Sequence, residues 1–167
     1  MIDTDPQALE RTRTMIYPER YGQWDDKIRL TSNAGDQTFH AVFISTPPDS
    51  HVPIAIRALD DHDPRILVIE KPLCPPDLKG LSDLQTACRD SGAIALVGYN
   101  HNLTANTVEA RQILSAGWVG KPQSIHVRWQ EHWGGILAAH PWLAGPSDSY
   151  LGHSVRGGGA CAEHSHA

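Results

Sequence analysis

The chain has 167 residues, of which 40% are hydrophobic and 20% are charged, as is typical of a globular protein with one domain, or one domain and part of another. Its net charge of −5, from 14 Lys and Arg and 19 Asp and Glu, argues against a nucleic-acid partner, which requires a basic surface. No stretch approaches the ~18 consecutive apolar residues of a membrane-spanning helix, and the N-terminus lacks the basic start and apolar core of a signal peptide.

The cysteines are odd in number and form no C-x-x-C pair; they are Cys74, Cys88 and Cys161. Free thiols are usual in the reducing cytoplasm, whereas secreted proteins commonly pair their cysteines in disulfides. We therefore predict a cytoplasmic protein with free thiols and no membrane partner.

The first predicted elements are a helix and a short strand. Asp5 is a good N-cap and Pro6 is tolerated in the first helical turn, so a helix is predicted from about residue 5 to residue 17. Residues 27–31 alternate apolar and polar side chains, which predicts a short strand.

Three continuous apolar runs follow, at residues 41–45, 66–69 and 94–97. Each run is short and bounded by turn residues, which predicts a fully buried strand. Segments with helical periodicity separate the runs. This alternation of strand and helix is typical of a parallel α/β sheet that is covered by helices on both faces.

The predicted helices between and after these strands have recognisable ends. Asp49 or Ser50 can cap a helix that runs to about residue 62. Apolar residues recur at helical spacing from Leu78 onward, and Gly92 ends that helix. A further helix is expected over roughly 104–116.

A polar segment follows each strand: STPP at 45–48, EKP at 70–72 and GYN at 98–100. Because the carboxyl ends of parallel strands meet at one edge, where ligands gather, these segments are expected to share one rim. Lys71 can hold a substrate hydroxyl there and stabilise charge as its proton leaves. The alternative is a solvated Glu70–Lys71 pair where the strand enters a loop.

The Thr46-Pro47-Pro48 segment, with His51 close behind it, is also a candidate binding element. Two prolines shape the backbone and remove two amide donors, which suits a wall against a flat ring. The alternative is an ordinary loop in which Asp49 caps the following helix.

The composition of the chain changes after Gly120. Residues 123–133 alternate apolar and polar side chains, as a half-exposed antiparallel strand does. Residues 134–156 are predicted to form a long loop, and three consecutive glycines at 157–159 to form a flexible joint. We therefore place a domain boundary near residue 120, with 1–120 as one domain and 121–167 as the beginning of a second.

The last residues contain a candidate acid/base pair. Glu163 and His166 share a face if a helix follows the glycines, and a carboxylate beside an imidazole orients the ring and raises its basicity. The alternative is a flexible tail. Cys161, Glu163, His164 and His166, with His153 nearby, are also possible metal ligands, but C-x-E-H-x-H is not a recognised zinc spacing, and no metal site is predicted.

These motifs, in this order, resemble the glucose–fructose oxidoreductase/inositol dehydrogenase family (Gfo/Idh/MocA). The resemblance rests on the segments TPP with His51, EKPL, VGYN, GWVGKP at 117–122, and GGG with Glu163 and His166. It implies an NAD(P)-binding Rossmann domain, a doubly wound parallel sheet, followed by an α/β domain with a mostly antiparallel sheet. It also implies hydride transfer between the cofactor and a hydroxyl carbon of a sugar, cyclitol or related compound.

The resemblance further implies roles for individual residues. Lys71 would contact both the substrate and the nicotinamide ribose, and His166 would be the catalytic acid/base with Glu163 beside it. Asp3 falls where the family has the acidic residue for the adenosine ribose, which favours NAD over NADP. The residues expected to bind the cofactor are Asp3, Thr46, Pro47, Pro48, His51, Glu70, Lys71 and Asn100.

The 167 residues differ from the family pattern in having no G-x-G-x-x-G turn for the pyrophosphate. We therefore expect this chain to be an inactive piece of an oxidoreductase, or to require a partner, and exposed strand edges to favour a homo-oligomer. The alternative is a non-catalytic module, derived from the family, that binds a sugar or a protein.

Overall fold

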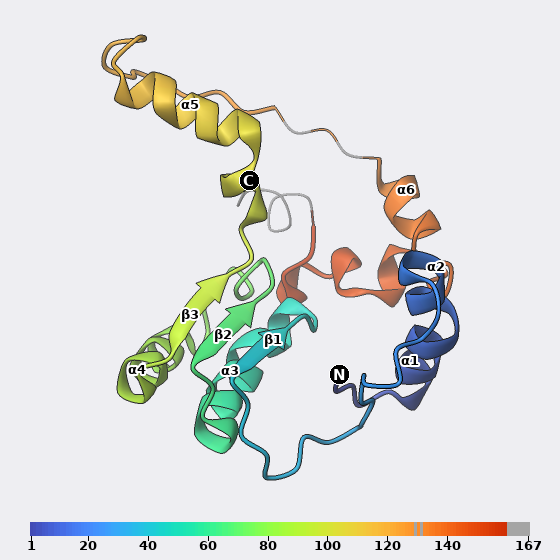
Figure 1. The fold of residues 1–167 in the computed structure, drawn as a ribbon. Helices are drawn as coiled ribbons and strands as arrows, with labels where there is room; N and C mark the ends of the chain where they lie inside the picture. Colours follow the sequence, from blue (N-terminus) through green and yellow to red (C-terminus); the bar gives the residue numbers. More distant parts are fainter. Residues whose placement is uncertain (129, 131, 160–167) are drawn as a thin grey trace. The chain divides into compact units, whose positions relative to one another are not determined.

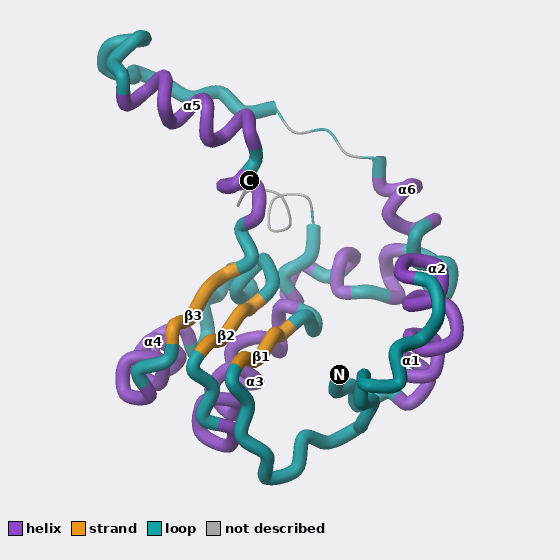
Figure 2. Tube along the Cα trace, in the orientation of Figure 1, coloured by secondary structure: helices purple, strands orange, loops and turns teal. Residues whose placement is uncertain are grey.

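The computed structural model describes residues 1–128, 130 and 132–159. These residues form two compact units, Met1–Thr38 and a second unit from Phe39 onward (Figures 1 and 2). Among the described residues, no helix is both long and apolar enough to cross a membrane.

The first unit is a helical segment with a wide turn in its middle. It consists of α1 (Pro6–Arg11), a π-helical turn (Thr12–Ile16) and α2 (Tyr17–Tyr21). Asp5 caps it as predicted, its side chain accepting a hydrogen bond from the amide of Gln7. The predicted end at residue 17 is wrong, because the helical segment continues to Tyr21. Pro18 has no N–H to donate, and the wide turn just before it lets the helix accommodate this residue.

The strand predicted at residues 27–31 is absent. The amide of Lys27 donates to the side chain of Asp25 and the amide of Ile28 to its carbonyl, both at 2.9 Å, and this turn competes with extended pairing. Thr31 alone makes a parallel bridge, to Ile2.

The second unit is built on the predicted parallel sheet. It has three strands in the order β1 (Ala41–Ile44), β2 (Ile66–Ile69) and β3 (Ile94–Val97). Both pairings are parallel and in register, so that Ile44 lies opposite Ile69, and Ile69 opposite Val97. The helices α3 (Pro48–His62) and α4 (Leu81–Ser91) connect the strands.

Within the second unit, helices α3 and α4 cover one face of this sheet, and cover on the other face stays a prediction. Right-handed crossovers between strands in consecutive order place their helices on the same side, and α3 and α4 pack together against one face (Figure 1). The core lies there; it consists of Ile44, Val52, Ala55, Ala58, Leu59, Leu67, Ile69 and Leu84. On the other face, Phe43 is 73% exposed and Leu96 is 52% exposed.

Two predicted helix starts are displaced. Helix α3 begins at Pro48 with Pro47 as its N-cap, and so neither Asp49 nor Ser50 caps it. Proline at the first helical position loses no hydrogen bond, which lets this helix begin earlier. Helix α4 begins at Leu81 rather than Leu78, because Leu78 has a positive φ of 56°, outside the right-handed helical region.

The segment after β3 agrees with the prediction only in its first part. A 3₁₀ turn (Asn100–Leu103) leads into α5 (Ala105–Ser115), where a helix was expected. Residues 123–128 form no strand, contrary to the prediction, and part of the remaining predicted strand lies outside the described residues. The predicted loop contains α6 (Trp133–Ala138) and three 3₁₀ turns, Pro146–Asp148, Tyr150–Gly152 and Ser154–Arg156.

Candidate functional site

The three polar strand ends form one rim, as the sequence predicts. The strands end level with one another at Ile44, Ile69 and Val97. The parallel ladder continues by one residue, because the amide of Glu70 donates to the carbonyl of Ile44 and that of Gly98 to Ile69, both at 2.8 Å. The segments that follow therefore leave the sheet from the same edge.

The Glu70–Lys71 segment is held at this edge by its own carboxylate and by a neighbouring glycine. The amide of Lys71 donates to Oε2 of Glu70 at 3.0 Å. A Cβ on Gly98 would lie 3.4 Å from that carboxylate, about van der Waals contact, so Glu70 lies directly beside this glycine. Glu70 is exposed and Lys71 is half-buried, which leaves one anionic and one cationic group at the rim.

The Thr46-Pro47-Pro48 turn closes the rim beside β1. Oγ of Ser50 lies 2.7 Å from both Oγ1 of Thr46 and the carbonyl oxygen of Pro47. This contact links the turn to the first turn of α3. Thr46 is exposed, whereas Pro48 is buried, so the hydroxyl-bearing part of the turn faces solvent.

His51 lies behind the rim rather than on it. Its side chain is 1% exposed. Nδ1 lies 2.9 Å from the carbonyl oxygen of Pro72, and Nε2 lies 2.6 Å from that of Thr46. Because both ring nitrogens contact the protein's own backbone, any contribution of His51 to cofactor binding is indirect.

The third strand end turns sharply after Val97. The amide of Tyr99 donates to the carbonyl of Val97 at 2.7 Å, and that of Asn100 to Gly98 at 2.9 Å. Asn100 is exposed and begins the 3₁₀ turn. The chain therefore leaves the sheet at Gly98, which lies beside the Glu70 carboxylate.

Sequence reasoning missed a second segment at the rim. Nε of Arg156 donates to Oδ2 of Asp49 in the first turn of α3, at 2.8 Å. Gly157 follows with φ of +90°, and a Cβ there would lie 2.8 Å from Cβ of Pro48. The glycines are therefore no flexible joint, since Gly157 and Gly158 are buried against α3 and the Tyr150–Gly152 turn. No local signal could reveal a pair that is 107 residues apart.

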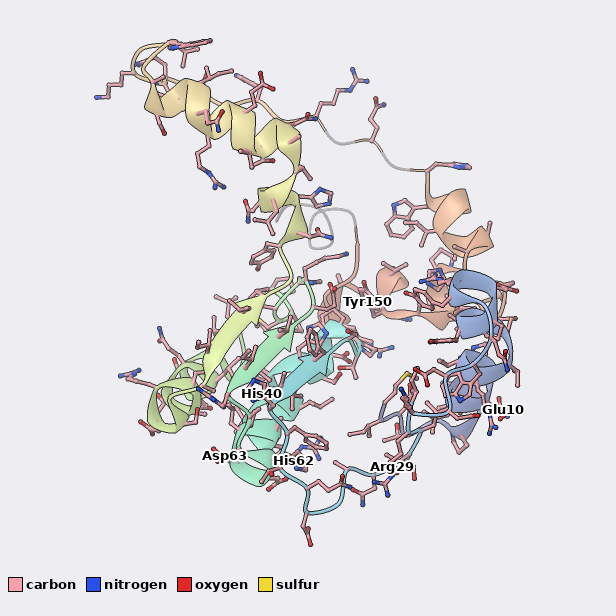
Figure 3. The ribbon with its side chains drawn as sticks, in the orientation of Figure 1. Glu10, Arg29, His40, His62, Asp63 and Tyr150 are labelled. Carbon is pink, nitrogen blue, oxygen red and sulfur yellow. The ribbon has the colours of Figure 1, made fainter. Side chains whose placement is uncertain are left out.

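Figure 3 separates the two ends of the second unit. His40, His62 and Asp63 lie at the amino end of the strands, away from the rim, whereas Tyr150 lies at the rim end. Phe39 and His62 pack edge to face there, with ring centroids 5.2 Å apart. These histidines therefore belong to the packing of the sheet's far end.

Cys74, two residues beyond Pro72, has a thiol whose reactivity is lowered by its surroundings. Burial, and in second place the Asp77 carboxylate, raises the pKa of its thiol. A raised pKa keeps the sulfur protonated, and the thiol is a much poorer nucleophile than the thiolate.

Three predicted site residues are not brought to the rim by the described structure. Asp3 belongs to the first unit, where its carboxylate accepts a hydrogen bond from the amide of Asp5 at 2.9 Å. Glu163 and His166 lie outside the described residues, as do the candidate metal ligands Cys161 and His164. Within the part that the structure describes, no cluster of three metal-ligating side chains occurs.

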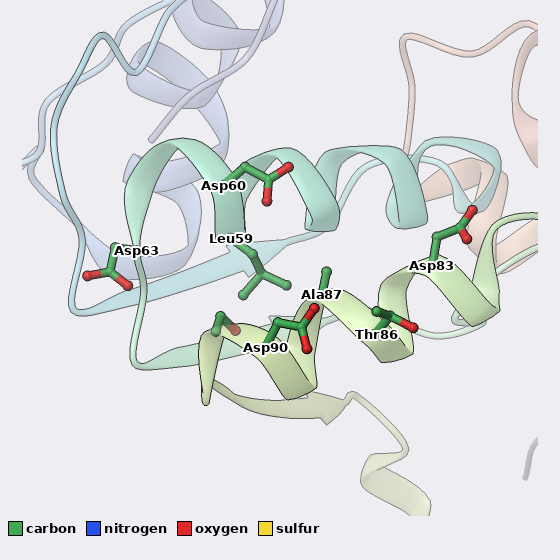
Figure 4. A pocket seen from close by; sticks show the side chains of 8 residues that line it. Leu59, Asp60, Asp63, Asp83, Thr86, Ala87 and Asp90 are labelled. Atoms are coloured by element: carbon green, nitrogen blue, oxygen red, sulfur yellow. The ribbon is translucent and has the colours of Figure 1, made fainter.

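A groove of about 620 Å³ lies between α3 and α4, away from the rim (Figure 4). It is lined by Leu59, Asp60, Asp63, Asp83, Thr86, Ala87, Asp90 and Ser91. Four carboxylates make the groove unsuited to an anionic ligand such as a dinucleotide. The rim is therefore the better candidate for a site that binds one.

The sequence pattern of the Gfo/Idh/MocA family, described as an oxidoreductase family with an NAD-binding Rossmann fold, matches residues 2–99. The matched region covers more than half of the chain and includes all three strands of the rim. The chain belongs to this family. No curated protein matches the sequence significantly.

Solved structures with the same fold include sugar and inositol dehydrogenases. The WlbA dehydrogenase from Bordetella pertussis, in complex with NADH and UDP-GlcNAcA, is 22% identical with a TM-score of 0.55; the match covers 72% of this chain and 34% of that one. The myo-inositol 2-dehydrogenase from Lactobacillus plantarum is 20% identical with a TM-score of 0.56, and the match covers 72% of this chain and 33% of that one. The scyllo-inositol dehydrogenase from Lactobacillus casei, with bound NAD(H) and scyllo-inositol, is 17% identical with a TM-score of 0.53, and the match covers 72% of this chain and 33% of that one. The chain thus spans about a third of each.

Proposed function

We propose that this chain is part of an NAD-dependent oxidoreductase that acts on a hydroxyl group of a sugar, a cyclitol or a related compound. The observation that supports this most is the rim, where Glu70 and Lys71 lie between the Thr46 turn and the Tyr99 turn in a member of an NAD-binding family. Two of the structural relatives carry a nicotinamide cofactor together with a sugar nucleotide or a cyclitol.

In this proposal Lys71 and His166 share the work on the substrate. The ammonium of Lys71 donates a hydrogen bond to the reacting hydroxyl and stabilises negative charge as its proton leaves. His166 receives that proton, and Glu163 orients its ring. A bound nicotinamide ring supplies the acceptor for the hydride.

The described residues fit the nicotinamide end of a cofactor. Exposed Thr46, Glu70 and Asn100 provide a hydroxyl, a carboxylate and an amide at the rim, groups that hydrogen-bond to ribose hydroxyls. Pro47 would form the wall beside the ring, and the buried Pro48 and His51 would support it from behind. In the first unit, Asp3 would accept from the adenosine ribose, and its charge would disfavour the extra phosphate of NADP.

We further propose that residues 121–167 begin a substrate domain and that the intact protein is a cytoplasmic homo-oligomer. The exposed apolar face of the sheet supports self-association, because large uncovered apolar patches favour protein contacts. A non-catalytic sugar- or protein-binding module remains the second candidate. Its distinguishing property would be binding of a sugar or protein without turnover of a polyol.

A cofactor titration combined with a lysine variant tests the proposal. In an enzyme that includes an upstream glycine turn, Lys71→Ala is expected to abolish turnover of polyols while NAD binding is largely kept. The control Lys79→Ala, an exposed lysine in the loop before α4, is expected to leave both unchanged. Normal turnover in the Lys71 variant contradicts the assigned role.

For the 167-residue chain itself, calorimetry is expected to detect no NAD binding. The reason is that the backbone turn that receives the pyrophosphate is not among these residues. Micromolar affinity for NAD would contradict this expectation. Binding of a sugar without NAD would favour the non-catalytic module.

A further inference from the structure

His51 is a buried polar side chain in an otherwise apolar core. It lies in the first turn of α3, and its side chain is 1% exposed. The two atoms opposite its ring nitrogens belong to different segments of the rim: the carbonyl oxygen of Thr46, after β1, and that of Pro72, after β2. The ring therefore bridges the two segments from beneath.

Both of these partners are carbonyl oxygens, which accept hydrogen bonds and never donate. Each ring nitrogen can bond to its partner only if it carries a hydrogen. A neutral imidazole has one N–H, and its other nitrogen would turn a lone pair toward a carbonyl oxygen in a buried site. Such an unsatisfied buried contact is unfavourable, whereas the doubly protonated ring satisfies both oxygens.

Two effects oppose a positive ring at this place. Burial removes the ring from water, which disfavours its charged form, and the amino end of a helix carries partial positive charge, which disfavours a cation in the first turn. The two direct contacts of 2.9 Å and 2.6 Å replace the lost hydration of the two N–H groups, and the helix effect is diffuse by comparison. Charge-assisted hydrogen bonds are short and stronger than neutral ones, which favours the doubly protonated form.

We propose that His51 is held as an imidazolium that cross-links the Thr46 turn to the Lys71–Pro72 turn, and that it thereby positions Lys71. The carbonyl that it holds belongs to Pro72, the residue directly after Lys71. Fixing that carbonyl fixes the backbone from which the lysine projects. The part of this inference that concerns catalysis by Lys71 rests on the proposed function, whereas the cross-link does not.

The direct test is nuclear magnetic resonance of the ring nitrogens in the 167-residue chain. Long-range ¹H–¹⁵N spectra at neutral pH are expected to show both nitrogens of His51 in the protonated range. Exposed His126 serves as the reference for a ring in solvent. A His51 ring with one unprotonated nitrogen overturns the imidazolium.

The positioning role is tested with two substitutions of His51. His51→Leu removes both donors and is expected to shift the amide resonance of Lys71 and to speed its hydrogen exchange, because the turn is no longer anchored. His51→Gln keeps an NH₂ group with two donor hydrogens and is expected to restore part of the protection. His62→Gln, at the far end of the same helix, is the control.

If His51→Leu does not fold, the ring spectrum of the unchanged chain and the glutamine variant still decide the question. A Lys71 amide that is unaffected by His51→Gln and by His51→Leu overturns the positioning role. These measurements need neither cofactor nor turnover. Failure of the cross-link is therefore distinguishable from failure of the proposed function, which the Lys71→Ala experiment tests separately.

Discussion

The two faces of the sheet are made of the same residue types and have opposite environments. On the face toward α3 and α4, Leu67 is 0% exposed and Ile69 is 1% exposed. On the other face, Phe43 and Leu96 are largely exposed, although they belong to the strands that pair with β2 on either side. The contrast shows that a continuous apolar run does not reveal how many faces of the sheet are covered by the helices that connect its strands.

This comparison also locates the stability of the second unit. Burial of apolar area contributes roughly 25 cal/mol per Å², and only side chains on the covered face obtain this gain in full. The rim is connected to that face through α3, which supplies part of the core and also His51, whose ring contacts the carbonyl of Thr46.

The largest expected effect comes from truncating the same residue type on each face. Leu67→Ala is expected to lower the free energy of unfolding by about 2–5 kcal/mol, because it leaves a cavity in the packed core. Leu96→Ala is expected to change it by no more than about 0.5 kcal/mol, as is usual for surface positions. Urea denaturation followed by circular dichroism measures both. Equal losses would show that the second face is also covered in solution.

An intermediate effect is expected on self-association. Replacing Phe43 and Leu96 together by serine is expected to reduce any dimer or larger species, because the exposed apolar patch is removed. Sedimentation velocity over a range of concentrations measures this change. Val155→Ser, at another exposed apolar residue, is the control, and an equal reduction in that variant would show that the sheet face is not the contact.

The smallest effect is expected on thiol reactivity. Burial raises the pKa of Cys88, which packs against the core from α4, so less of it is thiolate near pH 8. With Leu96→Cys, the introduced thiol on the open face is expected to react severalfold faster with iodoacetamide than Cys88 does. Peptide mass spectrometry assigns each adduct, and the two rates should converge in urea. Similar rates in the folded chain would contradict the difference between the faces.

Sequence patterns predicted the central α/β region well because its signals are local. The three apolar runs are bounded by turn residues, and the observed strands agree with them to within one residue. Alternation alone was a poor guide elsewhere. The strands predicted at 27–31 and 123–133 rested on a short period-two pattern with no partner strand in view, and a strand is stable only when another pairs with it.

The rim was predictable for the same reason that the strands were. Parallel strands must deliver their carboxyl ends to one edge, so the order of strands and helices along the chain is enough to group Thr46, Lys71 and Tyr99. The support behind the rim could not be predicted. His51 was expected to contact a cofactor, whereas its ring nitrogens contact Thr46 and Pro72, and the Arg156–Asp49 pair joins distant segments.

The linear sequence was sufficient to establish the alternation of strands and helices, the family, and which polar residues stand at the strand ends, because these depend on neighbours along the chain. Tertiary contacts were needed to establish which face of the sheet α3 and α4 cover, that Gly157 is buried against α3 rather than forming a flexible joint, and that His51 bridges two turns. Those outcomes depend on contacts between segments far apart in the sequence, and such contacts leave no periodic signal in it.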